Sequence, residues 1–190
     1  MKGEWVYNAN YFSKEDCEAL ITAAKELPVA DANMGFYSER TNTDYRRTKL
    51  RWVDRTVQPQ FEAVYSEFWK FANAINHDWF NFNITYLPPL QFTEYTEEQR
   101  SEYKSHQDVF WLNPTPRHRK LTVVLQLSDP ADYDGGDLVL ESVGERPPED
   151  RIRLQGTFIA FPSFVYHSLT PVTRGTRHSL VAWFEGPKFQ

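Results

Sequence analysis

The 190-residue chain has one cysteine, Cys17, so no disulfide can form within it. It shows no charged-then-apolar leader at its N-terminus and no apolar run long enough to cross a membrane. We therefore expect a cytoplasmic protein with a reduced cysteine and no membrane partner. Basic residues are outnumbered by acidic ones, for a formal net charge of −5, so no overall basic field favours a nucleic-acid partner.

Internal repeats, low-complexity tracts and linkers are also missing, and a chain of this length usually forms one domain with a substantial core. Hydrophobic residues make up 41% and charged residues 25%, which is typical of a globular protein. Aromatic residues are abundant at 16%. Wide aromatic side chains suit a barrel filled around a pocket, although most of them can equally be ordinary core.

The first part of the chain predicts two helices, over residues 13–27 and 59–76. Ser13 with Asp16 three residues later is a capping signal, and Pro28 follows the end of the first helix. The second helix has apolar residues along one stripe, which is typical of a helix packed on a core. Between the helices we expect a loop that ends in a short strand at 50–53.

After Asp78 the pattern predicts short strands. Residues 80–86 alternate strictly between apolar and polar types, which indicates a half-buried strand. Residues 134–137 read Asp-Gly-Gly-Asp, a turn signal, because glycine adopts the positive φ angles that tight turns need. The other expected strands are 90–95, 103–108, 121–127, 138–140, 157–161, 165–167 and 178–184. Helices followed by many short strands predict an α+β protein whose main body is a β-barrel or jelly roll.

His106, Asp108 and His167 are the candidate metal ligands. Side chains alternate along a strand, so a His-x-Asp pair can direct both ligands to one face. A second histidine from another strand would complete a set of two imidazoles and one carboxylate, the arrangement used by non-haem Fe(II) oxygenases. Such pairs are common by chance, and a lone histidine in a strand is usually structural. The spacing alone therefore leaves both interpretations open.

Two stretches around these residues identify a family. Residues 127–140 read LSDPADYDGGDLVL and residues 161–177 read FPSFVYHSLTPVTRGTR. Together with Ser-His-Gln-Asp at 105–108, they resemble the PKHD-type hydroxylases, relatives of the prolyl 4-hydroxylases in the 2-oxoglutarate and Fe(II)-dependent dioxygenase superfamily. The resemblance covers about 91–185, half of the chain. It implies a double-stranded β-helix (jelly-roll) core with helices packed on one side.

The resemblance also implies roles for individual residues. His106, Asp108 and His167 match the iron ligands, and Arg177 matches the residue that pairs with the distal carboxylate of 2-oxoglutarate. An arginine can hold such a carboxylate through two parallel hydrogen bonds. The predicted helpers in cosubstrate binding are Tyr95, Thr122, Gln126 and Ser179. Gln126 stands where animal prolyl hydroxylases tend to have a cosubstrate-binding tyrosine, and the three hydroxyls can equally be core groups bonded to backbone.

We expect one dioxygenase domain over 1–190, with a helical support and rim over 1–78 and the β-barrel core over 79–186. The expected cofactors are Fe(II) and the cosubstrate 2-oxoglutarate, with ascorbate as an optional addition. Dioxygen is consumed, an unactivated C–H bond is hydroxylated, and succinate and CO2 are released. The expected substrate is a peptidyl proline or a similar protein residue. The alternatives are a free amino acid or small metabolite and, from another class, a non-catalytic metal-dependent binding module.

The basic stretch at 46–51 is the candidate substrate contact. Arg46, Arg47 and Arg51 lie in a polar segment, 36–51, that has no clear period. Long loops within a compact domain are often functional, so the segment is either a lid over the metal or a solvated edge with its basic face in water.

Overall fold

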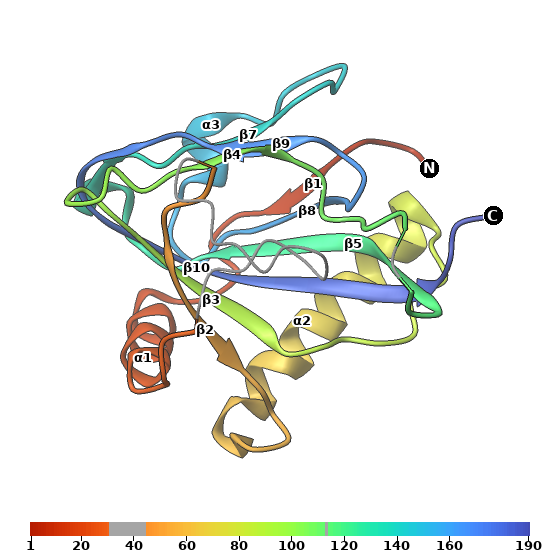
Figure 1. Cartoon of the computed structure of the whole chain (residues 1–190), viewed down its shortest axis with the longest axis horizontal. Coiled ribbons are helices and arrows are strands. Elements are labelled where there is room, and N and C mark those ends of the chain that lie inside the picture. The colour runs from red at the N-terminus through yellow and green to blue at the C-terminus, as the bar shows by residue number, and fades with distance from the viewer. Residues whose placement is uncertain (31–44, 113) are drawn as a thin grey trace.

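The structure, a computed structural model, describes residues 1–30, 45–112 and 114–190. Within these ranges two β-sheets lie one above the other, and α1 and α2 cover the lower face of the larger sheet (Figure 1). The larger sheet has the order β1-β8-β5-β10-β3-β2, with β6 paired to β10, and the smaller sheet has the order β4-β9-β7. This arrangement confirms the predicted α+β class, with helices on one side of a double-stranded β-helix.

The strands of the larger sheet pair antiparallel throughout the described residues. They are β1 (Val6–Asn8), β2 (Lys49–Val53), β3 (Leu90–Thr96), β5 (Arg117–Gln126), β6 (Tyr133–Gly135), β8 (Phe158–Pro162) and β10 (Val172–Pro187). The smaller sheet consists of β4 (Tyr103–His106), β7 (Leu138–Leu140) and β9 (His167–Leu169). The helical elements are α1 (Lys14–Lys25), η1 (Pro59–Phe61), α2 (Glu62–Ile75), η2 (Asn76–Phe80), η3 (Pro130–Asp132) and α3 (Glu149–Ile152).

Both predicted helices are confirmed. The Ser13 hydroxyl accepts a hydrogen bond from the Asp16 backbone N–H at 3.1 Å, which caps the start of α1. The apolar stripe of α2 packs on the larger sheet, where Phe68 and Phe71 contact Phe158 of β8 at ring distances of 4.8 and 4.6 Å. Aromatic packing between α2 and the sheet therefore fixes the position of this helix.

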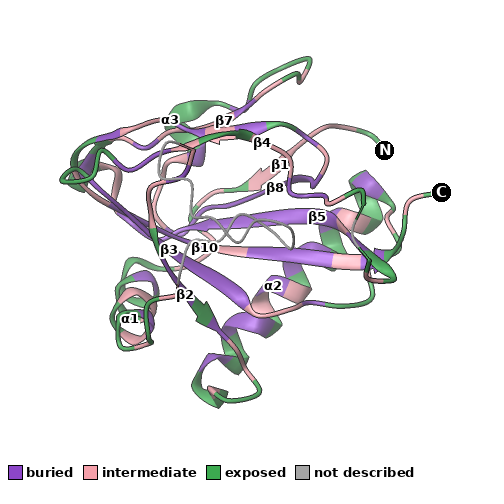
Figure 2. Cartoon of the chain, viewed as in Figure 1, coloured by how far each residue is buried: buried purple, intermediate pink, exposed green. Residues whose placement is uncertain are grey.

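The core side of the larger sheet is apolar and the opposite side is mixed. Buried residues run along β3, β5 and β10 (Figure 2). Because side chains alternate, residues one apart in each strand face opposite sides. The side toward α2 carries Phe92, Leu121, Val123, Leu125, Leu180, Ala182 and Phe184. The other side faces the smaller sheet and holds the polar residues of the candidate site.

The Gly-Gly pair has the predicted positive φ angles and supports the site directly, although Asp134 and Gly135 end strand β6 rather than forming a turn. Gly135 and Gly136 have φ angles of 67° and 64°, values that residues with a side chain rarely adopt. A Cβ on Gly136 would lie 3.1 Å from Cδ of Arg177, so this glycine also gives that arginine its space.

Several expectations were wrong in detail, and the strand expected at 165–167 lies instead at His167–Leu169. Residues 81–85 form no strand, and only an isolated bridge joins Tyr86 to Glu185, because alternation indicates a half-buried segment but does not supply a strand partner. His118 lies in β5 and is buried, and its Nδ1 accepts a hydrogen bond from the Phe189 backbone N–H. Within the first 78 residues, β1 and β2 join the larger sheet beside the two helices. No helix in the described ranges is long and apolar enough to cross a membrane.

Candidate metal centre and cosubstrate pocket

His106, Asp108 and His167 come together in the structure. His106 ends β4 and His167 begins β9, and these two residues are direct partners across the smaller sheet. Asp108 follows β4, and its backbone N–H donates to the Ser163 carbonyl, which fixes the chain at this point. One ligating atom from each of the three lies within 4.8 Å of the others. The predicted ligands therefore form one cluster between the two sheets.

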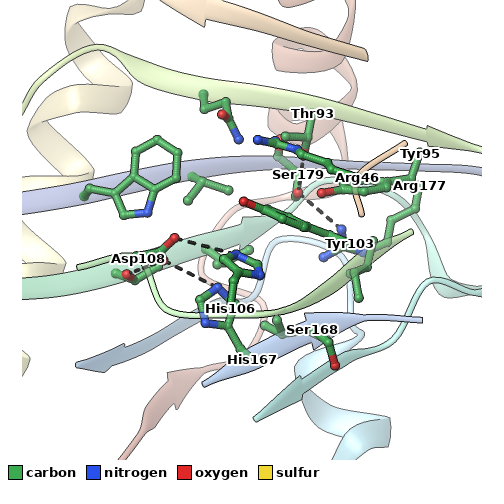
Figure 3. A pocket seen from close by; sticks show the side chains of 17 residues that line it. Arg46, Thr93, Tyr95, Tyr103, His106, Asp108, His167, Ser168, Arg177 and Ser179 are labelled. Carbon is green, nitrogen blue, oxygen red and sulfur yellow. Dashed lines mark hydrogen bonds and ion pairs between the residues drawn. The ribbon is translucent and has the colours of Figure 1, made fainter. Parts of the chain in front are cut away.

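The two imidazoles direct the same nitrogen at the cluster. Nδ1 of His106 lies 2.8 Å from the Lys104 carbonyl, and Nδ1 of His167 lies 3.0 Å from the Val165 carbonyl. A carbonyl can only accept, so each Nδ1 carries the proton and each Nε2 keeps its lone pair. Both Nε2 atoms face the Asp108 carboxylate, at 3.8 Å for His106 and 3.5 Å for His167 (Figure 3). This orientation suits metal coordination.

The electrostatic surroundings of His106 and Asp108 hold these two candidate ligands in the protonation states that metal binding requires. Burial, together with the neighbouring His167, lowers the pKa of His106 to about 4, although Asp108 opposes the shift. Burial by itself raises the pKa of Asp108, but the nearby His167 and His106 outweigh it and hold that pKa below its usual value. At neutral pH the His106 imidazole is therefore neutral and the Asp108 carboxylate is ionised.

A hydroxyl pair holds the Asp108 carboxylate. Thr122 of β5 donates to Oδ2 of Asp108 at 2.7 Å and lies 3.0 Å from the Ser163 hydroxyl. The sequence predicted Thr122 as a donor to the cosubstrate, and the structure gives it a different partner. Its position is that of a residue that orients a metal ligand.

Arg177 lines the same small cavity as the three ligands. The cavity has a volume of about 60 Å³. Arg177 comes from β10 and is 2% exposed, yet it forms no ion pair with any described carboxylate. Its Nε has no hydrogen-bond partner in the part of the chain that the structure describes. A buried guanidinium without a counter-charge is costly, so this position calls for an anionic ligand.

The other predicted cosubstrate residues surround Arg177. Nη1 of Arg177 donates to the Ser179 hydroxyl at 3.3 Å, and Nη2 donates to Oε1 of Gln126 at 2.7 Å. Tyr95 is the partner of Arg177 across β3 and β10, with its ring 5.8 Å from the guanidinium. Tyr95 and Ser179 line the cavity. Gln126 orients the guanidinium from its side, and a direct contact of Gln126 with the cosubstrate stays a prediction.

Of the three predicted substrate arginines, only Arg46 is brought to the site, where it lines the cavity. Arg47 forms an ion pair with Glu102 and donates to backbone carbonyls. Arg51 extends toward the helix side of β2, where its Nε donates to the Leu27 carbonyl. We withdraw these two because alternation and local partners direct them elsewhere. The expected lid includes residues 36–44, which lie outside the described residues.

Several residues of the cavity were missed by the sequence analysis. Thr93 lies 2.7 Å from the Ser179 hydroxyl and shares the inner face of β3 with Tyr95. Alternation along β3 could have identified it. Tyr103 stacks on His106 at a ring distance of 3.6 Å, and Figure 3 places it between the ligand cluster and Arg177. Only the three-dimensional pairing of strands brings Tyr103 there.

The residues present fit Fe(II) and 2-oxoglutarate. Two neutral imidazole nitrogens and a carboxylate are a donor set that Fe(II) accepts while positions remain open for other ligands. The unpaired Arg177 meets the need of a dicarboxylate for a cation away from the metal. The hydroxyls of Thr93 and Ser179 lie beside this guanidinium and are further hydrogen-bonding groups for a carboxylate.

Comparison of the sequence with known proteins points the same way. The model of the 2OG-Fe(II) oxygenase superfamily matches residues 90–185, which is half of the chain. A PKHD-type hydroxylase of Paraburkholderia phytofirmans is 38% identical over 103 residues, covering 52% of this chain and 42% of that protein. The PKHD-type hydroxylase YbiX of Shigella boydii is 36% identical over 83 residues, covering 43% and 33%. The chain thus aligns with less than half the length of these relatives.

Solved structures show the same fold. A prolyl-4-hydroxylase from Pseudomonas putida superposes with a TM-score of 0.72 at 21% identity, covering 97% of this chain and 94% of the other. A prolyl hydroxylase from Trichoplax adhaerens, solved with a peptide fragment of hypoxia inducible factor, gives a TM-score of 0.73 at 16% identity, with coverage of 96% and 83%. At these identities the likeness concerns the fold.

Proposed function

The chain belongs to the 2-oxoglutarate and Fe(II)-dependent oxygenase superfamily, and we propose that it hydroxylates an unactivated C–H bond of a peptidyl proline or a similar protein residue. The residues 1–190 would act as one catalytic domain, because both sheets contribute to the cavity. The relatives carry the name hydroxylase, and the observation that carries the proposal is the unpaired Arg177 in one cavity with three metal-ligand candidates.

The proposed roles follow from the geometry. His106, Asp108 and His167 would hold Fe(II), with backbone carbonyls fixing both imidazoles and Thr122 fixing the carboxylate. Arg177 would bind the distal carboxylate of 2-oxoglutarate. The residues that support this contact are Thr93, Gln126 and Ser179.

When bound, Fe(II) and 2-oxoglutarate together activate dioxygen for C–H hydroxylation, with succinate and CO2 as co-products. The protein contributes position and a dry environment rather than a side-chain acid or base. The inner wall carries Val124, Leu138, Leu169 and Val181 beside the polar groups, which limits water in the cavity. Dry surroundings also strengthen the interaction of Arg177 with a carboxylate.

The size of the adjoining cleft favours a peptide over a free amino acid. A second cavity of about 1050 Å³ shares His106 and Asp108 with the inner one. This volume lies just above the range of about 300–1,000 Å³ that is usual for small-molecule pockets, so a single amino acid would leave most of it unfilled. Trp52, Tyr86 and Tyr166 are partly exposed on its wall and offer surface to a longer ligand.

The proposal is tested by incubating the purified chain with Fe(II), 2-oxoglutarate and a library of proline-containing peptides, with and without ascorbate. Mass spectrometry should detect a gain of one oxygen atom on a peptide, in step with succinate formation. Asp108→Ala is the control and should give neither product. A pool of free amino acids and metabolites is screened in parallel.

The two substrate classes give different outcomes. Hydroxylated peptides support the proposal, whereas products found only in the metabolite pool would move the assignment to a small-molecule hydroxylase. If Fe(II) and 2-oxoglutarate bind but no succinate forms with any substrate, the chain acts as a binding module instead. All four of the key residues are present, which favours an enzyme.

A further inference from the structure

The cleft outside the metal centre is rich in arginine and aromatic residues. Arg46, Arg117 and Arg119 all line it. Each guanidinium lies over an aromatic ring, at 4.5 Å from Tyr103 for Arg46, 4.8 Å from Tyr86 for Arg117, and 3.8 Å from Trp183 for Arg119. Stacking of this kind fixes the plane of a guanidinium and leaves the N–H groups at its edge available for hydrogen bonds.

None of the three guanidinium groups forms an ion pair with a carboxylate in residues 1–30, 45–112 and 114–190. Arg46 is only 7% exposed, and its Nε and Nη2 have no hydrogen-bond partner among the described residues. A buried cation with unsatisfied donors is costly unless something outside the chain satisfies it. Arg46 lines both cavities, so its free donors lie where the cleft meets the metal centre.

The acidic residues of the cleft offset the charge of these arginines only in part. The acidic residues in its wall, within the described part, are Asp108 and Glu185. Asp108 is a candidate metal ligand, so its charge is directed to the metal. Burial raises the pKa of Glu185, although Arg119 and Arg117 oppose the shift, so its carboxylate is held less firmly in the charged form. The cleft therefore keeps an excess of positive charge.

We propose that this cleft binds an acidic peptide segment, whose carboxylates pair with Arg119 and Arg46 while its other side chains pack on the exposed aromatic residues. The inference rests on the proposed peptide hydroxylase activity and specifies the substrate for it. Arg119 is the central residue, because its guanidinium contacts two rings, with distances of 3.8 Å to Trp183 and 5.0 Å to Phe110. A guanidinium held against aromatic rings is preorganised to receive a carboxylate in its plane.

The test measures binding, so it does not depend on hydroxylation. The full chain is loaded with Fe(II) and 2-oxoglutarate without oxygen and titrated with two pools of synthetic peptides that share a central proline. One pool carries Asp or Glu at the flanking positions, and the other carries Asn or Gln. N-acetyl-aspartate and N-acetyl-glutamate are titrated separately as a third set of ligands, for comparison with the acidic peptides. Wild-type protein should bind the acidic pool about tenfold or more tightly than the amide pool, because each pairing involves charged groups.

Arg119→Gln should reduce this preference to about threefold or less, with 2-oxoglutarate affinity unchanged. Arg174→Gln is the matched control, because Arg174 forms an exposed ion pair with Asp134 away from the cleft, and it should keep the wild-type preference. Arg119→Lys keeps the charge but loses the planar fork, and should give an intermediate preference.

Equal binding of both peptide pools by wild-type protein would overturn the proposal. It would also be overturned by an acidic preference that Arg119→Gln leaves unchanged, or by N-acetyl amino acids that bind as tightly as the acidic peptides. The assay also separates this inference from the proposed function. Acidic peptides that bind through Arg119 but are never hydroxylated would sustain the binding site and contradict the peptide hydroxylase.

Discussion

The two faces of the larger sheet are built from the same strands but differ in composition and in role. Along β10, His178, Leu180, Ala182 and Phe184 face the helix side, whereas Arg177, Ser179, Val181 and Trp183 face the smaller sheet. Both faces are largely buried. The helix side is mostly apolar and well packed, and the other side carries charged and polar groups around a cavity.

The two faces also differ in what they contribute to the free energy of unfolding. Packed apolar side chains on the helix side stabilise the fold, at roughly 25 cal/mol per Å² of apolar surface removed from water. The inner side buries Arg177 and Asp108 and leaves some donors unsatisfied, which costs stability. The packing on the helix side thus compensates for the unfavourable burial of charged groups on the inner side. Ligand binding then offsets the cost of that burial. We expect mutations on the two faces to separate activity from stability.

The largest expected separation comes from Asp108→Ala. The substitution removes the carboxylate shared by His106 and His167, so Fe(II) binding and 2-oxoglutarate turnover should be lost completely. The free energy of unfolding of the metal-free protein should change by only about 1 kcal/mol, since no core packing is lost. Iron titration, succinate assays and urea unfolding measure the three quantities. Succinate production by the purified variant at saturating Fe(II) would contradict the metal assignment.

The reverse effect is expected for Phe158→Ala on the helix side. The ring of Phe158 contacts those of Phe68 and Phe71 on α2 and those of Tyr11 and Phe12 near α1, and it is fully buried. Its removal leaves a cavity and should lower the free energy of unfolding by about 3–5 kcal/mol. The fraction that stays folded should bind Fe(II) normally. Urea unfolding with a parallel iron titration checks both, and a loss below 1 kcal/mol would show that the packing there is replaceable.

Much of this difference between the two faces of the sheet can be predicted from the sequence. Because side chains alternate along a strand, Arg177 and Ser179 lie on one face of β10 and His178 lies on the other, where it stacks on Phe92. The capping residues of α1 and the positive φ angles of Gly135 and Gly136 also depend on the local sequence, and both are confirmed. Patterns with a period of two or of one helical turn can be seen in a single sequence.

The parts that failed depend on long-range contacts. Arg119 belongs to a basic run, and only the irregular register between β5 and β10, near Phe184 and Glu185, brings it over Trp183. His118 is buried because the C-terminal segment returns to cover it, which no local pattern indicates. Arg46 and Arg47 are adjacent and chemically alike, but only one of them reaches the cavity. The direction of each side chain is set by partners that are distant in the sequence.

Arg177→Ala tests a single residue of the inner face, with an exposed arginine as the comparison. Loss of a buried cation that binds a carboxylate costs about 3–5 kcal/mol, so 2-oxoglutarate affinity should fall by a factor of about hundreds to thousands, with little change in Fe(II) affinity. Lysine at this position should recover part of the binding. Arg174→Ala, which removes an exposed ion pair with Asp134, should have no effect on 2-oxoglutarate. Calorimetric titration measures both, and a loss of only two- or threefold would make Arg177 structural.

The smallest expected effect concerns His178, the buried titratable group on the helix side of β10. Burial, with Lys25 nearby, lowers the pKa of His178 to about 4, although Glu94 opposes the shift. Between pH 6.5 and 4 the unfolded chain therefore binds a proton at this histidine that the folded chain does not bind. The free energy of unfolding falls as the pH falls through that window, by up to about 3 kcal/mol from this residue. His178→Gln should remove this contribution, so the variant should lose less stability than wild type over the same range. Urea unfolding at a series of pH values measures the difference, and parallel curves for the two proteins would show that His178 does not govern acid sensitivity.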